Sequence, residues 1–225
     1  MENKPIPVID LFAGPGGLGE GFSAAGGRKR AGYFQVHLSI EKDSVAYTTL
    51  RLRSFFRKFP YGKAPKKYYD LLRGEIESRE LFNKYPKEAR AAENEVWCAE
   101  LGGRKTPGSE VDNRIKHAIG NSDKWVLIGG PPCQAYSIIG RSRNRAVKGY
   151  RIEADKRHSL YQEYLRIIYR HWPPVFVMEN VKGLLSSRAN GNGLFSQILS
   201  DLKNPAAIYK QSNVYLFSNF CGVLY

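Results

Sequence analysis

Four short, largely apolar runs constrain the fold of this 225-residue chain more than any other feature. Each run ends in polar or glycine-rich sequence, and the runs are Val8–Phe12, Val36–Ile40, Trp125–Ile128 and Val175–Met178. Continuous hydrophobicity of this kind is typical of strands that are buried on both faces of a parallel sheet. A fifth run, Val214–Phe217, lies near the end of the sequence.

Stretches with helical character separate these runs, namely Gly17–Ala25, Ser44–Lys58 and Leu160–His171. The alternation predicts an α/β fold with a mostly parallel sheet, helices on both faces, and ligands beyond the carboxyl ends of the strands. The segment 51–95 is rich in Arg, Lys and Tyr and is longer than one crossover helix requires. A solvated helical insertion is the favoured interpretation, and contact with phosphate and bases is the alternative for Arg57, Lys58, Lys63, Lys66, Lys67, Tyr68 and Tyr69.

The composition limits the classes of binding partner and the cellular compartments that fit this chain. Thirty-five Lys and Arg against 21 Asp and Glu give a net charge of +14, which favours nucleic acid over an acidic membrane surface as a partner. A merely soluble basic protein explains the charge equally well. Cys98, Cys133 and Cys221 are widely spaced and form neither a disulfide framework nor a zinc pattern, so we expect a reduced, cytoplasmic setting. No apolar run is long enough to cross a membrane.

A glycine-rich loop, Asp10–Gly19, follows the first predicted strand and leads into a helix. Glycine there lets the backbone turn tightly and approach a ligand closely. The next strand ends at Glu41, where a carboxylate can bind ribose hydroxyls. Because no phosphate-binding lysine follows the glycines, the loop suits an adenosine-containing ligand rather than a hydrolysed triphosphate. A dinucleotide and S-adenosylmethionine both remain open at this point.

A second turn, Gly129–Cys133, follows the strand Trp125–Ile128. Two glycines and two prolines enforce a rigid, non-helical turn at the carboxyl end of the strand. We expect this turn to present the Cys133 thiol to a cleft at this end of the sheet instead of burying it in the core. A cysteine thiolate is a strong nucleophile. Glu179 follows the strand Val175–Met178 and supplies a carboxyl group that can carry a proton.

Together these motifs resemble the cytosine-5 DNA methyltransferase family. The resemblance rests on the loop from Phe12 to Gly21-Phe22, on Pro131–Gln134 and on Glu179–Val181, in the family's order, with Tyr161–Leu165 where the family has a helix. It implies a Rossmann-like S-adenosylmethionine-dependent methyltransferase fold. Residues 1–225 would then form one catalytic domain, interrupted by the insertion and belonging to a restriction-modification or related system.

The resemblance also implies a mechanism and a set of site residues. Cys133 would add to carbon 6 of a flipped cytosine, and Glu179 would protonate or hydrogen-bond ring nitrogen 3. S-adenosylmethionine would be the donor and S-adenosylhomocysteine the product. The implied donor-binding residues are Phe12, Ala13, Gly14, Gly16, Gly17, Glu41, Glu100 and Pro131, with Asp123 as a weaker alternative to Glu100. The implied nucleic-acid contacts, on a family loop that closes over the base, are Ser137, Arg141, Arg143 and Arg145.

The sequence departs from the family at its end, where Leu224 and Tyr225 stand in place of the expected Pro-Gln. On this basis we expect a truncated domain without the last antiparallel strand and the target-recognition domain. Such a chain would have little sequence-specific activity alone and would work with a complementing C-terminal chain. The alternatives are a tRNA cytosine-5 methyltransferase, a non-catalytic fragment that binds nucleic acid, and, less favoured, a nicotinamide dehydrogenase.

Overall fold

The structure is a computed structural model that describes residues 4–25, 32–131, 160–179, 188–189 and 192–204. The chain divides into two compact units, residues 1–129 and residues 130–225. The first unit contains β1 (Ile6–Leu11), α1 (Gly17–Ala24), β2 (Phe34–Glu41), α2 (Ser44–Arg57), α3 (Lys66–Leu72), α4 (Ser78–Lys84), α5 (Pro86–Glu95), β3 (Val96–Cys98), α6 (Gly108–Ile119) and β4 (Val126–Gly129). The second contains α8 (Leu160–His171), β5 (Val175–Met178), β6 (Arg188–Ala189), β7 (Asn192–Gly193) and α9 (Leu194–Lys203).

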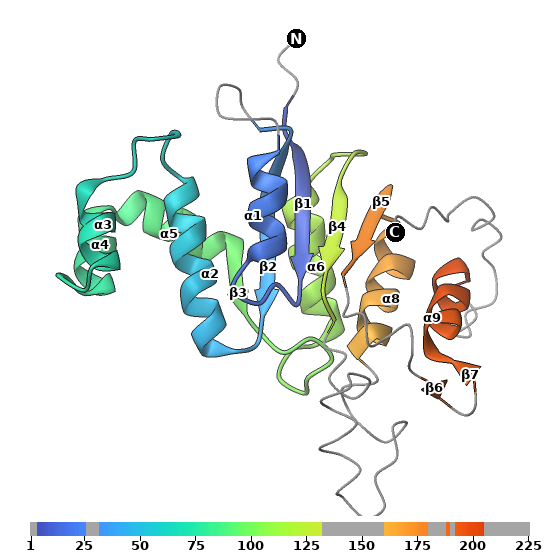
Figure 1. The fold of residues 1–225 in the computed structure, drawn as a ribbon. Helices are drawn as coiled ribbons and strands as arrows, with labels where there is room; N and C mark the ends of the chain where they lie inside the picture. The colour runs from blue at the N-terminus through green and yellow to red at the C-terminus, as the bar shows by residue number, and fades with distance from the viewer. Residues whose placement is uncertain (1–3, 26–31, 132–159, 180–187, 190–191, 205–225) are drawn as a thin grey trace, which may run out of the picture. The chain divides into compact units, whose positions relative to one another are not determined.

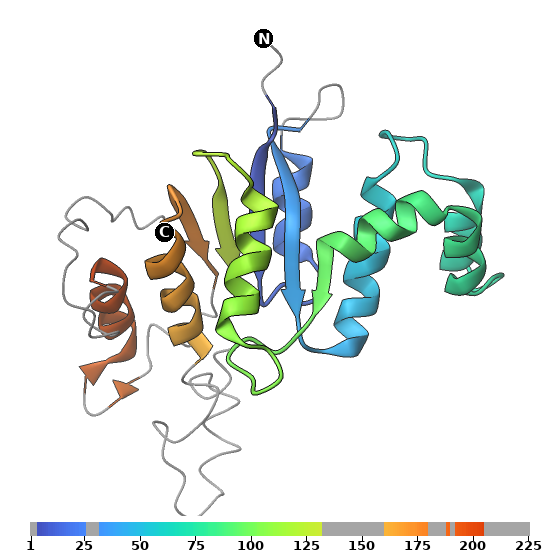
Figure 2. The same ribbon diagram turned by 180° about the vertical axis from the view of Figure 1, so that it is seen from behind.

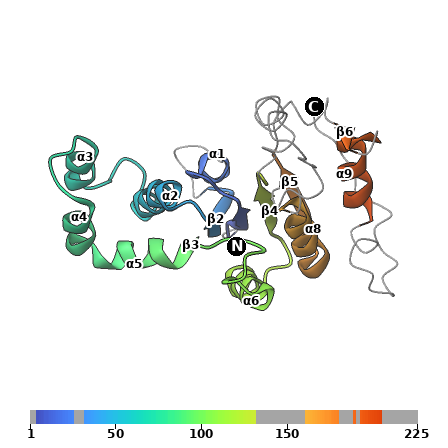
Figure 3. The same cartoon turned by 90° about the horizontal axis from the view of Figure 1, so that it is seen from below.

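Four parallel strands form the sheet of the first unit, in the order β3-β2-β1-β4. Helices cover it on both sides, with α1 on one face and α6 on the other (Figures 1, 2 and 3). Because both faces are covered, consecutive β1 residues such as Val8 and Ile9 are both fully buried. This arrangement confirms the predicted α/β fold with a parallel sheet between helices.

The strand register brings the functional loops to one edge of this sheet. Leu11, at the end of β1, pairs with Ile40 of β2 and with Gly129 at the end of β4. Glu41 pairs with Cys98 at the end of β3. The glycine loop, the segment after Glu41, the segment after Cys98 and the segment after Gly129 therefore all leave the sheet at its carboxyl edge.

The predicted strands and helices agree closely with the observed ones. The apolar runs correspond to β1, β2, β4 and β5, and the three helical stretches correspond to α1, α2 and α8. Five elements were not predicted, namely β3, α6, β6, β7 and α9. The fifth apolar run, Val214–Phe217, lies outside the described residues.

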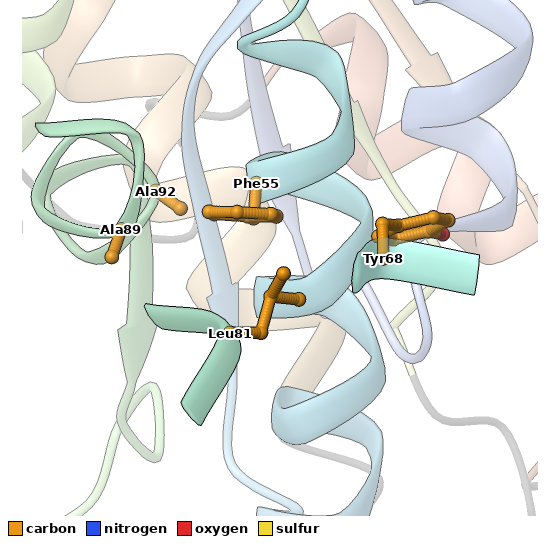
Figure 4. Packing of buried hydrophobic residues seen from close by; sticks show 5 residues of the cluster. All are labelled: Phe55, Tyr68, Leu81, Ala89 and Ala92. Atoms are coloured by element: carbon orange, nitrogen blue, oxygen red, sulfur yellow. The ribbon is translucent and has the colours of Figure 1, made fainter. Parts of the chain in front are cut away.

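The helices α3, α4 and α5 pack on α2 and form a hydrophobic cluster of their own. Figure 4 shows its buried members converging from four helices: Phe55 from α2, Tyr68 from α3, Leu81 from α4, and Ala89 and Ala92 from α5. The Phe55 ring is fully buried and makes edge-to-face contacts with three further rings, those of Phe59, Phe82 and Tyr85. In Figure 3, α3 and α4 lie on the side of α2 that faces away from the strands. The cluster therefore joins the helices of the segment between α2 and β3 to one another.

We expect Phe55→Ala to lower the free energy of unfolding by about 3–5 kcal/mol, because it removes a fully buried ring and leaves a cavity. Chemical denaturation measures this change. Leu72→Ala, at a position where the side chain is 58% exposed, is the control and should change stability by less than about 0.5 kcal/mol. Equal effects of the two substitutions would contradict this cluster as the core of the helical segment.

In the second unit, α8 packs against β5 through Tyr164. This side chain is fully buried, its hydroxyl donates a hydrogen bond of 2.9 Å to the Val177 carbonyl oxygen, and its ring contacts Phe176 edge to face. β6 and β7 form a short antiparallel pair followed by α9. Across the part of the chain that the structure describes, we find no helix with the length and apolar character that a membrane crossing requires.

Candidate functional site

The glycine loop between β1 and α1 has an unusual backbone. Gly14 and Gly16 have φ of 54° and 91°, in the left-handed region that glycine adopts without a steric penalty. Phe12 also has a positive φ, 55°, which is strained for a bulky residue. The turn is held by Ala13 N–H, which donates to the Ile40 carbonyl at 3.1 Å, and by Gly16 N–H, which donates to the Ala13 carbonyl at 2.9 Å. Such strain at a strand end marks a segment shaped for more than a simple turn.

The glycines of the loop serve two different purposes. A Cβ atom at Gly16 would lie 2.6 Å from Cδ1 of Leu50, so α2 packs directly on the loop there. At Gly14 and Gly17 an added Cβ would meet no atom within 4 Å among the described residues. The backbone at these two positions therefore faces open space, as a surface that approaches a ligand must.

Glu41 connects this loop to the end of β2. Its Oε2 accepts a hydrogen bond from Gly14 N–H at 2.8 Å, and its Oε1 accepts one from Asp43 N–H at 2.7 Å. Asp43 in turn caps α2, because its Oδ1 accepts from Val45 N–H and Ala46 N–H. Each Glu41 oxygen keeps a further lone pair, so the fixed carboxylate can accept two more hydrogen bonds.

Glu100 lies just beyond the carboxyl end of β3, on the same edge as Glu41. It is exposed, and its Oε1 is 3.3 Å from Nζ of Lys42. Asp123, the weaker alternative, is an exposed residue that precedes β4 and so lies at the opposite, amino edge of the sheet. The structure thus brings Glu100, and not Asp123, to the edge that carries the glycine loop.

Asp10 was not singled out from the sequence, yet it is the most unusual titratable group beside the loop. It is only 1% exposed and lies against Gly19, where an added Cβ would be 2.9 Å from Oδ2. Among the described residues, neither carboxylate oxygen accepts a hydrogen bond of ordinary length and angle. Burial raises the pKa of Asp10 from 3.8 to about 7, while Arg57 and the backbone N–H of Gly19 favour the charged form. The one signal in the sequence was a carboxylate inside an apolar run.

The raised pKa predicts how Asp10 affects stability. Below about pH 4 the carboxyl group is protonated in both the folded and the unfolded chain. Between about pH 4 and 7 the unfolded chain loses this proton while the folded chain keeps it, so Asp10 lowers stability increasingly as pH rises and by a constant amount above about pH 7.

We therefore expect the free energy of unfolding of Asp10→Asn, relative to wild type, to rise by a few kcal/mol between about pH 4 and 7 and then level off. Urea denaturation across this pH range measures the difference. Asp123→Asn, at an exposed aspartate, is the control and should show no such rise. A difference for Asp10→Asn that is independent of pH would contradict the assignment.

The second unit holds Gly130, Pro131 and Glu179. Pro131 is buried and Glu179 is exposed. A Cβ atom at Gly130 would lie 2.9 Å from Oε2 of Glu179, so the start of the Pro-Pro-Cys turn and the end of β5 are in close contact. The remaining predicted site residues, Cys133, Ser137, Arg141, Arg143 and Arg145, lie outside the described residues.

Comparison with known proteins adds an independent observation. The sequence profile described as C-5 cytosine-specific DNA methylase matches residues 87–223, a range that includes the Pro-Pro-Cys turn and Glu179. Among curated proteins, the type II methyltransferase M.Bpa9945I of Bacillus paralicheniformis is 31% identical over 95% of this chain and 50% of its own length. The type II methyltransferase M.DdeI of Desulfomicrobium norvegicum is 29% identical over 86% of this chain and 32% of its own length. The chain thus spans about half or less of the length of these relatives.

Proposed function

The chain belongs to the C-5 cytosine-specific DNA methylase family, and we propose that it transfers a methyl group from S-adenosylmethionine to carbon 5 of cytosine in DNA. The observation that carries this proposal is the 2.8 Å hydrogen bond from Gly14 N–H to the Glu41 carboxylate. It joins a glycine loop, open to a ligand, to a carboxylate with free lone pairs at the carboxyl edge of a parallel sheet. This is the arrangement that an adenosine-containing donor requires.

The residues at this edge fit the donor. Glu41 would accept hydrogen bonds from the ribose hydroxyls, Phe12 would pack against the adenine, and Glu100 would accept from its amino group. The open backbone from Gly14 to Gly17 would face the amino-acid part, with Ala13 within the same turn. Pro131 is a further proposed donor contact, by resemblance to the family. When bound, S-adenosylmethionine supplies an activated methyl group, and S-adenosylhomocysteine is the product.

The chain's own residues would make cytosine reactive. Carbon 5 of cytosine is a poor nucleophile, so the Cys133 thiolate would first form a bond to carbon 6 and push electron density onto carbon 5. Glu179 would donate a hydrogen bond or a proton to ring nitrogen 3 and stabilise the electron-rich ring. After methylation, loss of the carbon 5 proton would break the bond to sulfur and regenerate the Cys133 thiolate.

Chain connectivity supports a joint role for these two side chains. Gly130 contacts the Glu179 carboxylate, and Cys133 follows Gly130 by three residues. Three residues span at most about 11 Å, so both side chains can reach one cytosine ring. A cytosine within a duplex would first be flipped out, at a cost of a few kcal/mol of unstacking. Ser137, Arg141, Arg143 and Arg145 would contact the DNA backbone near the flipped base.

Glu41→Gln should weaken binding of S-adenosylhomocysteine about tenfold or more, because the charged acceptor of the ribose hydroxyls is lost. Isothermal titration calorimetry on the whole chain measures the Kd. Glu77→Gln, at an exposed residue of the helical segment, is the control and should bind like wild type. Failure of the wild-type chain to bind would contradict the donor assignment, and unchanged binding by Glu41→Gln would contradict the role of Glu41.

With S-adenosylmethionine added, the chain should form a denaturation-resistant adduct with duplex DNA that contains 5-fluorocytosine. After methyl transfer, fluorine at carbon 5 cannot leave as the proton does, so the bond to sulfur is not released and even slow turnover is trapped. Cys133→Ser should abolish the adduct, and Cys98→Ser, at an exposed cysteine, should not. Electrophoresis in denaturant detects the product. An adduct with Cys133→Ser, or with fluorinated tRNA in place of DNA, would overturn this part of the proposal.

The proposed partners are DNA and a complementing C-terminal chain. The second is compatible with the relatives' greater length, since the chain covers 50% of M.Bpa9945I and 32% of M.DdeI. The adduct assay can be repeated after adding the part of M.Bpa9945I that does not align with this chain. A higher yield at defined sites would support the complementing chain, and an unchanged, site-specific yield would contradict it.

A further inference from the structure

One arginine links the helix that follows the glycine loop to the helical segment between α2 and β3. Arg57, the last residue of α2, forms ion pairs with Glu20 of α1 and with Glu95, the last residue of α5. Lys58 also pairs with Glu95. The side chains of Arg57 and Glu95 are only 15% and 5% exposed, so water screens their interaction weakly. The charges of three helices therefore meet at one point, where Arg57 and Glu95 are largely buried and Glu20 is 36% exposed.

These ion pairs lie close to the glycine loop. Glu20 is close to it in sequence, and α2, which carries Arg57, contacts it in space. α1 begins at Gly17, directly after the loop, and Glu20 stands in its first turn. α2 also touches the loop itself, because Leu50 occupies the space that a side chain at Gly16 would need. The Arg57 guanidinium also partly opposes the rise that burial causes in the pKa of Asp10. α2 thus holds the loop at Gly16 and the following helix at Glu20.

Arg51 provides an internal comparison. It also lies on α2 and also pairs with a glutamate of α5, Glu93, while its guanidinium stacks over the Phe82 ring. Within the described part of the chain, no ion pair joins Arg51 to α1. Arg51 and Arg57 therefore share the α2–α5 contact and differ in the contact with Glu20.

We propose that Arg57 is a positioning residue for the glycine loop. Through its ion pairs with Glu20 and Glu95, it also couples the helical segment α3–α5 to donor binding. The inference rests on the proposed function, since the loop is taken to bind S-adenosylmethionine. By fixing the first turn of α1, Arg57 keeps the open backbone around Gly17 in a binding conformation before the donor arrives. A preformed loop loses less conformational freedom on binding and so binds more tightly.

The test compares Arg57→Gln, Glu20→Gln and the double variant with Arg51→Gln as the matched control. Calorimetry should show S-adenosylhomocysteine binding weakened about fivefold or more by Arg57→Gln and by Glu20→Gln, with a double variant no weaker than Arg57→Gln alone. Arg51→Gln should stay within about twofold of wild type. All variants are measured at a temperature where denaturation curves show them fully folded, so that lost stability does not enter the Kd.

Hydrogen exchange on the ligand-free chain supplies a readout that does not depend on the donor. Amides of residues 12–19 should exchange faster in Arg57→Gln and Glu20→Gln than in wild type, and unchanged in Arg51→Gln. If wild type fails to bind S-adenosylhomocysteine, the proposed function fails, and exchange still decides whether Arg57 positions the loop. Wild-type exchange and wild-type Kd in Glu20→Gln would overturn the inference.

Discussion

The Glu41 carboxylate holds the candidate site together, because its two oxygens bind backbone N–H groups from different segments. Gly14 N–H comes from the loop after β1, and Asp43 N–H comes from the turn that begins α2. With its carboxylate fixed, Glu41 sets the position of the loop relative to α2, and Leu50 of α2 then packs against Gly16. One acidic side chain at a strand end thus determines both the shape of the loop and the start of the helix that supports it.

The strands of the sheet and Glu41 could be predicted from the sequence, because a strand buried on both faces appears as a continuous run of apolar residues. The apolar runs located β1, β2, β4 and β5, and the end of the second run identified Glu41. β3 escaped because it has only three residues, of which Val96 alone is buried, so no apolar run marks it. The burial of Asp10 and the ion pairs of Arg57 were not predicted, because both depend on the packing of residues distant in the sequence. Arg57 is 37 residues from Glu20, and nothing local indicates that the two side chains meet.

The charge of the segment 51–95 illustrates the same limit. Its sequence contains twelve Lys and Arg and seven Asp and Glu, which made phosphate contact a reasonable alternative. The structure engages several of those cations internally: Arg57 and Lys58 with Glu95, and Lys67 with Glu80. Tyr68 is buried in the aromatic cluster. These four side chains make contacts within the protein. The argument for a nucleic-acid partner therefore depends on other cations of the chain and on the family.

The two halves of the proposed reaction rest on separate observations. Most of the donor argument comes from residues 4–129: the strained loop, the Glu41 hydrogen bonds, Glu100 and the Arg57 ion pairs, all within one compact unit. Glu179 and the contact with Gly130 belong to the other unit, and the proposed role of Cys133 rests on resemblance to the family and on chain connectivity. Donor binding and attack on cytosine can therefore fail independently. A chain that binds the donor without forming an adduct would still have the fold described here, since the described contacts of the loop are made by Glu41 and by Leu50 of α2.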